Sequence, residues 1–183
     1  MDSRALPEIL SSEIAVSTGH FRIERLHLRF ANGEKRVYER MLGGGNGAVM
    51  IVPVLGSDLL LVREYCAGTN SYELGFPKGR GEKGEDWRAT AQRELREETG
   101  YGAGNCTYLR KVNSAPSFFA SDIDLVLAED LFPAPLDSGD EPEPMELVKW
   151  PLARAADLLL EPGFREARCL AALAAAMRIR HWQ

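Results

Sequence analysis

Two apolar runs, residues 48–55 and 59–65, constrain the fold of this 183-residue chain most. They flank the tripeptide Gly56-Ser57-Asp58, which is typical of a tight turn. Apolar, β-rich runs joined by a turn signal predict a β-hairpin that is mostly buried. We therefore expect the core of the protein to include this hairpin.

The elements expected after this hairpin are strands and helices in turn. A short strand at 71–76 precedes a helix at 86–99, for which Asp86 is a suitable N-cap and Gly100 a suitable stop. The order strands, helix, strands, helices predicts an α/β (α+β) layered domain with a mixed β-sheet. The remaining strands are expected at 106–113, 123–131 and 145–150, and the remaining helices at 152–160 and 164–182.

The residues before the main domain predict a small separate element. Residues 20–30 mostly alternate between apolar and polar, Asn32-Gly33 is a strong hairpin signal, and residues 34–42 read as the returning strand. The sequence GGGNG at 43–47 is a flexible connection. We therefore expect an N-terminal antiparallel β-hairpin subdomain over residues 1–45 and a main domain over residues 46–183.

Composition and charge narrow the classes of function. A formal net charge of -5 disfavours a nucleic-acid partner, because such proteins usually carry a basic excess. The N-terminus lacks the features of a secretory signal, and no apolar run approaches the ~20 residues of a membrane span. Cys66, Cys106 and Cys169 lie far apart, which predicts reduced thiols rather than a disulfide or a zinc site. We expect a cytoplasmic protein with neither nucleic acid nor membrane as a partner.

The predicted helix at 86–99 carries an unusual cluster of acids. Glu94, Glu97 and Glu98 fall within roughly 100° of arc on one face, beside the apolar stripe. Like charges three or four residues apart repel by roughly 0.2–0.5 kcal/mol per pair. Either the face is solvated and salt-bridged, or the acids hold a divalent cation such as Mg²⁺, which prefers carboxylate oxygens.

The residues around this cluster favour the second interpretation. Gly79, five residues, Glu85, seven residues, then Arg93-Glu94-Leu95, one residue, Glu97-Glu98, one residue, Gly100 and Tyr101 resemble the Nudix box, Gx5Ex7REUxEExGU. Every fixed position matches, and only Tyr101 departs mildly from the aliphatic residue usual there. The resemblance implies a Nudix-type α/β/α sandwich that binds Mg²⁺ or Mn²⁺.

The resemblance also implies roles for particular residues. It implies that Glu94 and Glu98 are the main metal ligands, that Glu97 is a ligand directly or through water, and that the carbonyl of Lys78 meets a metal. Arg93 would orient a carboxylate of the box, first of all Glu85. Gly79 would mark the loop before the helix, and Gly100 would end the helix.

The implied activity is hydrolysis of a nucleoside diphosphate linked to another group. Arg93, Glu97 and Glu98 are the catalytic candidates on the helix. The general base is expected on the acidic, proline-rich loop at 132–144, where the candidates are Glu141 and Glu143, with Glu143 preferred. The alternative is that this loop is merely solvated.

The resemblance extends outside the box to five segments, at residues 36–41, 51–54, 61–76, 113–122 and 140–152. These segments resemble Nudix hydrolases that act on ADP-ribose, NADH and diadenosine polyphosphates and release AMP. Two departures argue against strict ADP-ribose preference: Cys66 stands where an arginine is usual, and residues 76–79 read FPKG. Two alternatives stay open. One is a dinucleoside polyphosphate hydrolase of narrower specificity, and the other is a nucleotide-binding regulator without catalysis, against which the intact box argues.

The candidates for substrate binding lie outside the box. They are Arg63, Glu73, Tyr38, Arg40 and Phe119. Each has a structural alternative, namely an ion pair on a strand, strand packing or core burial.

The Nudix resemblance further implies that the N-terminal subdomain pairs with a second subunit, which predicts a homodimer with substrate sites near its interface.

Overall fold

The computed structural model describes residues 4–136, 143 and 145–182. These residues form two compact units. The first contains the residues up to Gly45 together with Asn113–Asp122, and the second contains Asn46–Val112 with the residues from Ile123 onward. The segment 113–122 thus belongs to the first unit, although the sequence placed it in the main domain.

The first unit is built on a four-stranded sheet with the order β1-β2-β3-β9. The predicted hairpin is present as β2 and β3, and Gly33 adopts φ 85° in the turn between them. The strand β1 adds to the predicted hairpin, and its two register shifts against β2 explain why its sequence lacks a regular alternation. The strands are β1 (Glu8–Ser17), β2 (Arg22–Arg29), β3 (Lys35–Leu42) and β9 (Phe119–Ala120).

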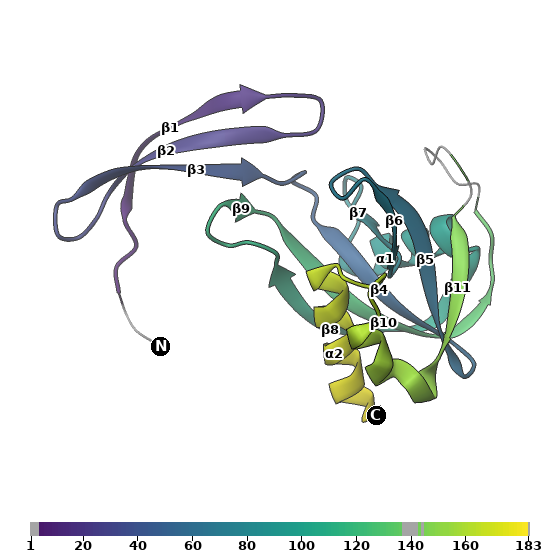
Figure 1. Cartoon of the computed structure of the whole chain (residues 1–183). Helices are drawn as coiled ribbons and strands as arrows, with labels where there is room; N and C mark the ends of the chain where they lie inside the picture. The colour runs from purple at the N-terminus through teal and green to yellow at the C-terminus, as the bar shows by residue number, and fades with distance from the viewer. Residues whose placement is uncertain (1–3, 137–142, 144, 183) are drawn as a thin grey trace. The chain divides into compact units, whose positions relative to one another are not determined.

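The second unit begins with the buried hairpin that the sequence predicted. β4 (Ala48–Leu55) and β5 (Asp58–Cys66) pair antiparallel next to their turn, with Val54 opposite Leu59. Each strand also has other neighbours (Figure 1). β5 pairs with β6 (Ser71–Gly75) and β11 (Glu146–Pro151), whereas β4 pairs with β7 (Lys78–Arg80) and β10 (Asp122–Pro133).

The sheet around β4 is mixed and is covered on both faces. β10 runs parallel to β4 and lies beside β8 (Tyr101–Asn113). Val49 and Ile51 pack in one core with Ala91 and Leu95 of the helix α1 (Trp87–Thr99). Alternate residues on the other face pack with α2 (Ala167–Arg180) and with η1 (Leu152–Leu160), a 3₁₀ helix. The predicted α/β/α layering is therefore confirmed.

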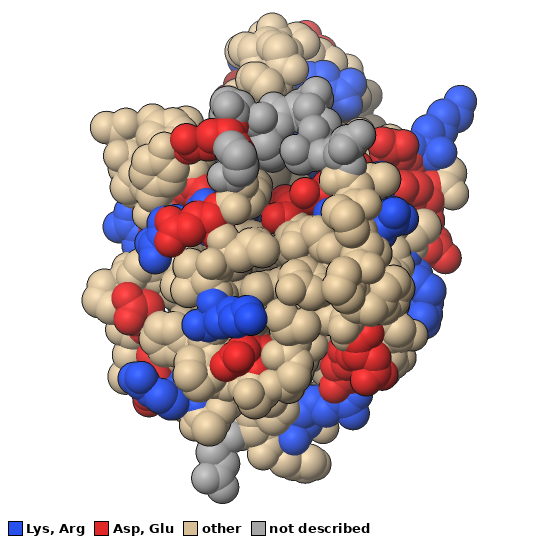
Figure 2. Space-filling view, turned by 90° about the vertical axis from the view of Figure 1, so that its right-hand side faces the viewer, with Lys and Arg blue, Asp and Glu red and all other residues tan. Residues whose placement is uncertain are grey.

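The surface charge and the cysteines complete the description of the fold. On the face in Figure 2, basic and acidic side chains are scattered over a mostly uncharged surface. All three cysteines are free, and Cys106 and Cys169 are buried. Among the residues described, no helix is long and apolar enough to cross a membrane.

Candidate active site

The acidic helix α1 begins and ends where its sequence predicted. The Asp86 carboxylate accepts a hydrogen bond of 2.8 Å from the N–H of Ala89 and so caps the first turn. Gly100 adopts φ 75° at the other end, a left-handed conformation that a side chain resists. Its N–H donates to the carbonyl of Arg96 at 3.0 Å. The helix thus has defined ends on either side of its glutamates.

The buried stripe of α1 brings the glutamates to the edge of the core. Ala91, Leu95 and Thr99 are buried, and Glu94 is itself only 9% exposed. A carboxylate removed from water in this way needs a compensating partner. For Glu94 that partner is the neighbouring Arg93, whose Nη1 lies 2.9 Å from Oε1.

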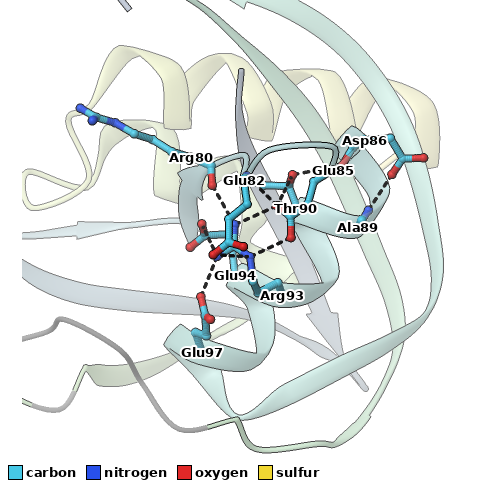
Figure 3. Close-up of polar contacts among 9 residues, drawn as sticks. All are labelled: Arg80, Glu82, Glu85, Asp86, Ala89, Thr90, Arg93, Glu94 and Glu97. Carbon is cyan, nitrogen blue, oxygen red and sulfur yellow. Dashed lines mark hydrogen bonds and ion pairs between the residues drawn. The ribbon is translucent and has the colours of Figure 1, made fainter. Parts of the chain in front are cut away.

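Arg93 is the centre of the polar network on this helix (Figure 3). Its Nε and Nη2 donate to the two carboxylate oxygens of Glu85, each at 3.0 Å, which is the bidentate geometry suited to a guanidinium. This contact holds the pKa of Glu85 at about 2. Nη1 also donates to Glu97 at 2.8 Å, and Nη2 to the carbonyl of Arg80 at 2.7 Å. One side chain therefore connects the loop before the helix, β7 and two turns of α1.

The three residues of β7 each approach α1. The N–H of Lys78 donates to Glu98 Oε2 at 3.1 Å. A Cβ atom placed on Gly79 would lie only 1.9 Å from Glu94 Cδ, so this glycine makes room for the carboxylate. The carbonyl of Arg80 accepts from Arg93. The backbone of β7 and the acids of α1 form one arrangement.

Burial is the largest influence on the pKa values of two acids of α1. Burial raises the pKa of Glu98 to about 8 and also raises the pKa of Glu94. Within the described part of the chain, no three His, Cys, Asp or Glu side chains are grouped as ready metal ligands. Glu94 and Glu97 instead accept hydrogen bonds from Arg93, and Glu98 accepts one from the N–H of Lys78. Carboxylate oxygens on adjacent turns of one helix are nevertheless the kind of ligand that a hard divalent cation prefers.

The predicted base candidates are only partly visible. Glu141 lies outside the described residues. Glu143 Oε1 accepts a hydrogen bond of 2.6 Å from the hydroxyl of Tyr72 on β6. The ring of Tyr72 lies edge-on to that of Tyr65, with 5.8 Å between the centroids. Glu143 is thus held beside β6.

Two predicted substrate residues of the second unit are engaged in ion pairs. Arg63 Nε lies 3.3 Å from Glu146 Oε2, its partner across β5 and β11. The carboxylate of Glu73 accepts from Arg165 Nε at 3.0 and 2.9 Å, and this contact lowers its pKa to about 2. Sequence reasoning missed Arg165, because it lies 92 residues from Glu73 and no motif links them.

The other three predicted substrate residues lie in the first unit. Arg40 Nε donates to Glu24 at 2.7 Å. Tyr38 is exposed, and its ring lies 6.3 Å from that of Phe30. The carbonyl of Phe119 accepts from Asn113 Nδ2 at 2.8 Å. Substrate roles for these residues stay predictions.

A second charged cluster lies beside Glu98 and was not foreseen. The ammonium of Lys78 binds the carboxylate of Glu64 on β5 and lies 4.0 Å from Glu166 Oε2, just before α2. The sequence pointed only to the carbonyl of Lys78. The FPKG segment was the one available signal for its side chain.

Comparisons with known families and proteins agree with this geometry. The family described as NUDIX domain matches residues 46–173, and that described as NudE-type Nudix hydrolase N-terminal domain matches residues 7–40. The ADP compounds hydrolase NudE of Escherichia coli (strain K12) is 48% identical over 176 residues, which cover 96% of this chain and 92% of that protein. An ADP-ribose pyrophosphatase of Bacillus subtilis (strain 168) is 33% identical over 55% of this chain and 54% of that protein.

A solved structure leads to the same family. The crystal structure of an ADP compounds hydrolase superposes with a TM-score of 0.92 at 46% identity, over 99% of this chain and 97% of that one. The resemblance that the box residues indicated is thereby confirmed. The chain belongs to the Nudix hydrolase family and carries an N-terminal domain of the NudE type.

Proposed function

We propose that the protein is a pyrophosphohydrolase that depends on Mg²⁺ or Mn²⁺, cleaves ADP-linked compounds and releases AMP. The observation that carries this proposal is the arrangement of Glu94, Glu97 and Glu98 around Arg93 and the backbone of β7. The names of relatives at 48% and 33% identity, an ADP compounds hydrolase and an ADP-ribose pyrophosphatase, support the substrate class.

The residues of α1 and β7 would hold the cation. Glu94 and Glu98 are the proposed ligands, with Glu97 and the carbonyl of Lys78 beside them. A bound divalent cation supplies charge neutralisation for the diphosphate and acidity for a water molecule. Arg93 keeps the carboxylates oriented, because its planar fork binds Glu85 at both oxygens while its remaining N–H groups reach Glu94 and Glu97.

A carboxylate must also accept the proton of the attacking water. We propose Glu143 for this role, with Glu141 as the second candidate. The hydroxyl of Tyr72 fixes one oxygen of Glu143, and the second oxygen is the proposed acceptor. A positioned general base contributes roughly 10²–10⁴-fold to a rate.

The proposed substrates are ADP-ribose, NADH and diadenosine polyphosphates. Cys66 lies on β5 where an arginine is usual, which favours this broad range over strict ADP-ribose preference. Hydrolysis of dinucleoside polyphosphates alone is the narrower alternative. Arg63, Glu73, Tyr38, Arg40 and Phe119 stay the proposed substrate contacts, and a raised KM in their alanine variants would identify them.

A product screen tests the proposal. The protein is incubated with each substrate and with Mg²⁺ or Mn²⁺ in ¹⁸O water, and AMP is detected by mass. AMP should form from at least one ADP-linked compound, and Glu98→Gln should lose most of that turnover. No AMP from any substrate would refute the proposal. Saturable binding without turnover would favour the regulator alternative.

We further propose that the protein is a homodimer that associates through the first unit. Ile9, Ile14 and Tyr38 are exposed on the same sheet face as Leu26 and Leu28. This face carries one ion pair, Arg40 with Glu24, whereas the opposite face carries those of Arg25 with Glu13 and Glu39 and of Arg29 with Glu8. An exposed apolar sheet face is suited to a second copy.

Light scattering tests this assembly. The wild-type protein should show twice the 20.3 kDa chain mass. Ile14→Glu should shift it to one chain mass, whereas Val37→Glu on the opposite face should not. A monomeric wild type would refute the dimer. The cytoplasmic location and the lack of a nucleic-acid partner stay predictions.

A further inference from the structure

The side chain of Lys78 is fixed by carboxylates from two other elements. Its ammonium binds Glu64 on β5 and lies 4.0 Å from Oε2 of Glu166, which precedes α2. Only 18% of the Lys78 side chain and 25% of the Glu64 side chain are exposed. A shielded ammonium of this kind depends on its carboxylate partner, because it has given up most of its water.

The backbone of the same residue touches the acidic site. The N–H of Lys78 donates to Glu98 Oε2 at 3.1 Å, and the next residue, Gly79, lies against the carboxylate of Glu94. A shift of this dipeptide therefore moves the supports of two glutamates together.

The strand that carries this dipeptide is short. β7 has three residues, and among the strands of the described residues it pairs only with β4, where Lys78 lies opposite Met50. So short an edge strand gains little from its ladder of hydrogen bonds. The bond from Lys78 to Glu64 adds an attachment to β5, which β7 does not otherwise pair with.

We propose that Lys78 and Glu64 are positioning residues of the acidic site: their buried ion pair holds the N–H of Lys78 against Glu98. The inference rests on the proposed function, since positioning has meaning only for a site that binds a cation. It assigns the Lys78 ammonium to the protein's own framework rather than to the substrate.

Mn²⁺ binding without substrate tests the pair directly. The dissociation constant is measured by electron paramagnetic resonance on the full chain for wild type, Lys78→Met, Glu64→Gln and the double variant. Lys83→Met is the control, because Lys83 is an exposed lysine in the turn after β7. Loss of a group that orients a metal ligand typically weakens metal binding by about 10–100-fold.

The expected result is a loss of that size in both single variants and none in the control. The double variant should lose no more than either single variant, because both substitutions remove the same contact. In metal-free protein, the amide hydrogen of Lys78 should exchange faster in Glu64→Gln, as followed by NMR. Circular dichroism confirms that each variant is folded.

Three results would overturn the inference. One is unchanged Mn²⁺ affinity and amide exchange in both variants, even if the melting temperature falls, which would leave the pair a purely structural role. The second is a raised KM with unchanged Mn²⁺ affinity, which would place the ammonium on the substrate. The third is a wild type that neither binds Mn²⁺ nor hydrolyses any ADP compound, which would refute the proposed function as well.

Discussion

Gly79 and Glu94 lie so close that a Cβ atom on Gly79 would be 1.9 Å from Glu94 Cδ and 2.0 Å from Oε2. The backbone of Gly79 does not have a positive φ, so the constraint is one of space rather than of conformation. The first residue of the box is thus a glycine because a proposed metal ligand occupies the space that a side chain would need.

Gly79→Ala should displace the Glu94 carboxylate from its place against β7. We expect a loss of about 1–3 kcal/mol in the free energy of unfolding, as for other overpacked sites. We also expect kcat to fall by about 10–100-fold, since the change misplaces a ligand. Urea unfolding and steady-state kinetics measure the two effects. Gly68→Ala is the control, because a Cβ there meets nothing within 4 Å; equal behaviour of the two variants would contradict the steric account.

Arg93→Lys should fail to replace the arginine, although the charge is kept. A lysine ammonium cannot bind both oxygens of Glu85 while also reaching Glu94 and Glu97. We expect a stability loss of about 1–3 kcal/mol in the metal-free protein. Arg110→Lys, at an exposed arginine of β8, should cost little. Chemical denaturation in EDTA compares the free energies of unfolding of the two variants. An Arg93→Lys variant as stable as the wild type would argue against Arg93 as the centre of the polar network.

The stability of the metal-free protein should depend on pH through Glu98. Burial raises the pKa of this carboxyl from its ordinary 4.5 to about 8. The folded state then holds the proton more tightly than the unfolded state, so the stability contribution present below pH 4.5 is lost as the pH rises toward 8. Urea unfolding in EDTA across this window should show the decline.

Two comparisons isolate this carboxyl. Glu98→Gln cannot ionise, so its stability should decline less over the same pH window. Saturating Mg²⁺ should raise the melting temperature most at the upper end, where the carboxylates are ionised. Parallel pH profiles for wild type and Glu98→Gln would show that other groups cause the decline.

Tyr72→Phe should reduce turnover if Glu143 is the base. The substitution removes the 2.6 Å hydrogen bond to Glu143 and keeps the ring. We expect kcat to fall by about tenfold, which corresponds to about 1.4 kcal/mol, with KM nearly unchanged. Tyr65→Phe is the matched control, because Tyr65 lies opposite Tyr72 and its hydroxyl binds Asn70 instead. A similar kcat in Tyr72→Phe and Tyr65→Phe, or full activity of Glu143→Gln, would exclude Glu143 as the general base.

The parts of the fold that the sequence predicted are those with local signals. The hairpin of β4 and β5 follows from its turn and apolar runs, and the ends of α1 follow from Asp86 and Gly100. The contact of Arg93 with Glu85 joins residues eight apart within the spacing of the box. Each of these features depends on residues that lie close together in the sequence.

The parts that escaped prediction depend on distant contacts. Arg165 meets Glu73 only because the segment before α2 runs along β6, where the N–H of Leu74 donates to the carbonyl of Gly163. The bond of Lys78 to Glu64 likewise needs β5 and β7 to be brought together. β1 was missed because its bulges break the period of two. Pairings between distant residues leave no pattern in either segment alone.

The division of the site between segments has a consequence for how such a protein can diverge. The acids, their arginine and their backbone supports all come from β7 and α1, which form one continuous stretch of chain. The side chains proposed to meet the substrate lie on β3, β5, β6 and β9 instead. Substitutions at single positions on these strands could therefore change the proposed substrate contacts while the continuous stretch that carries the acids stays the same, and Glu64 of β5, which binds Lys78, is the position where such a change would reach the acids.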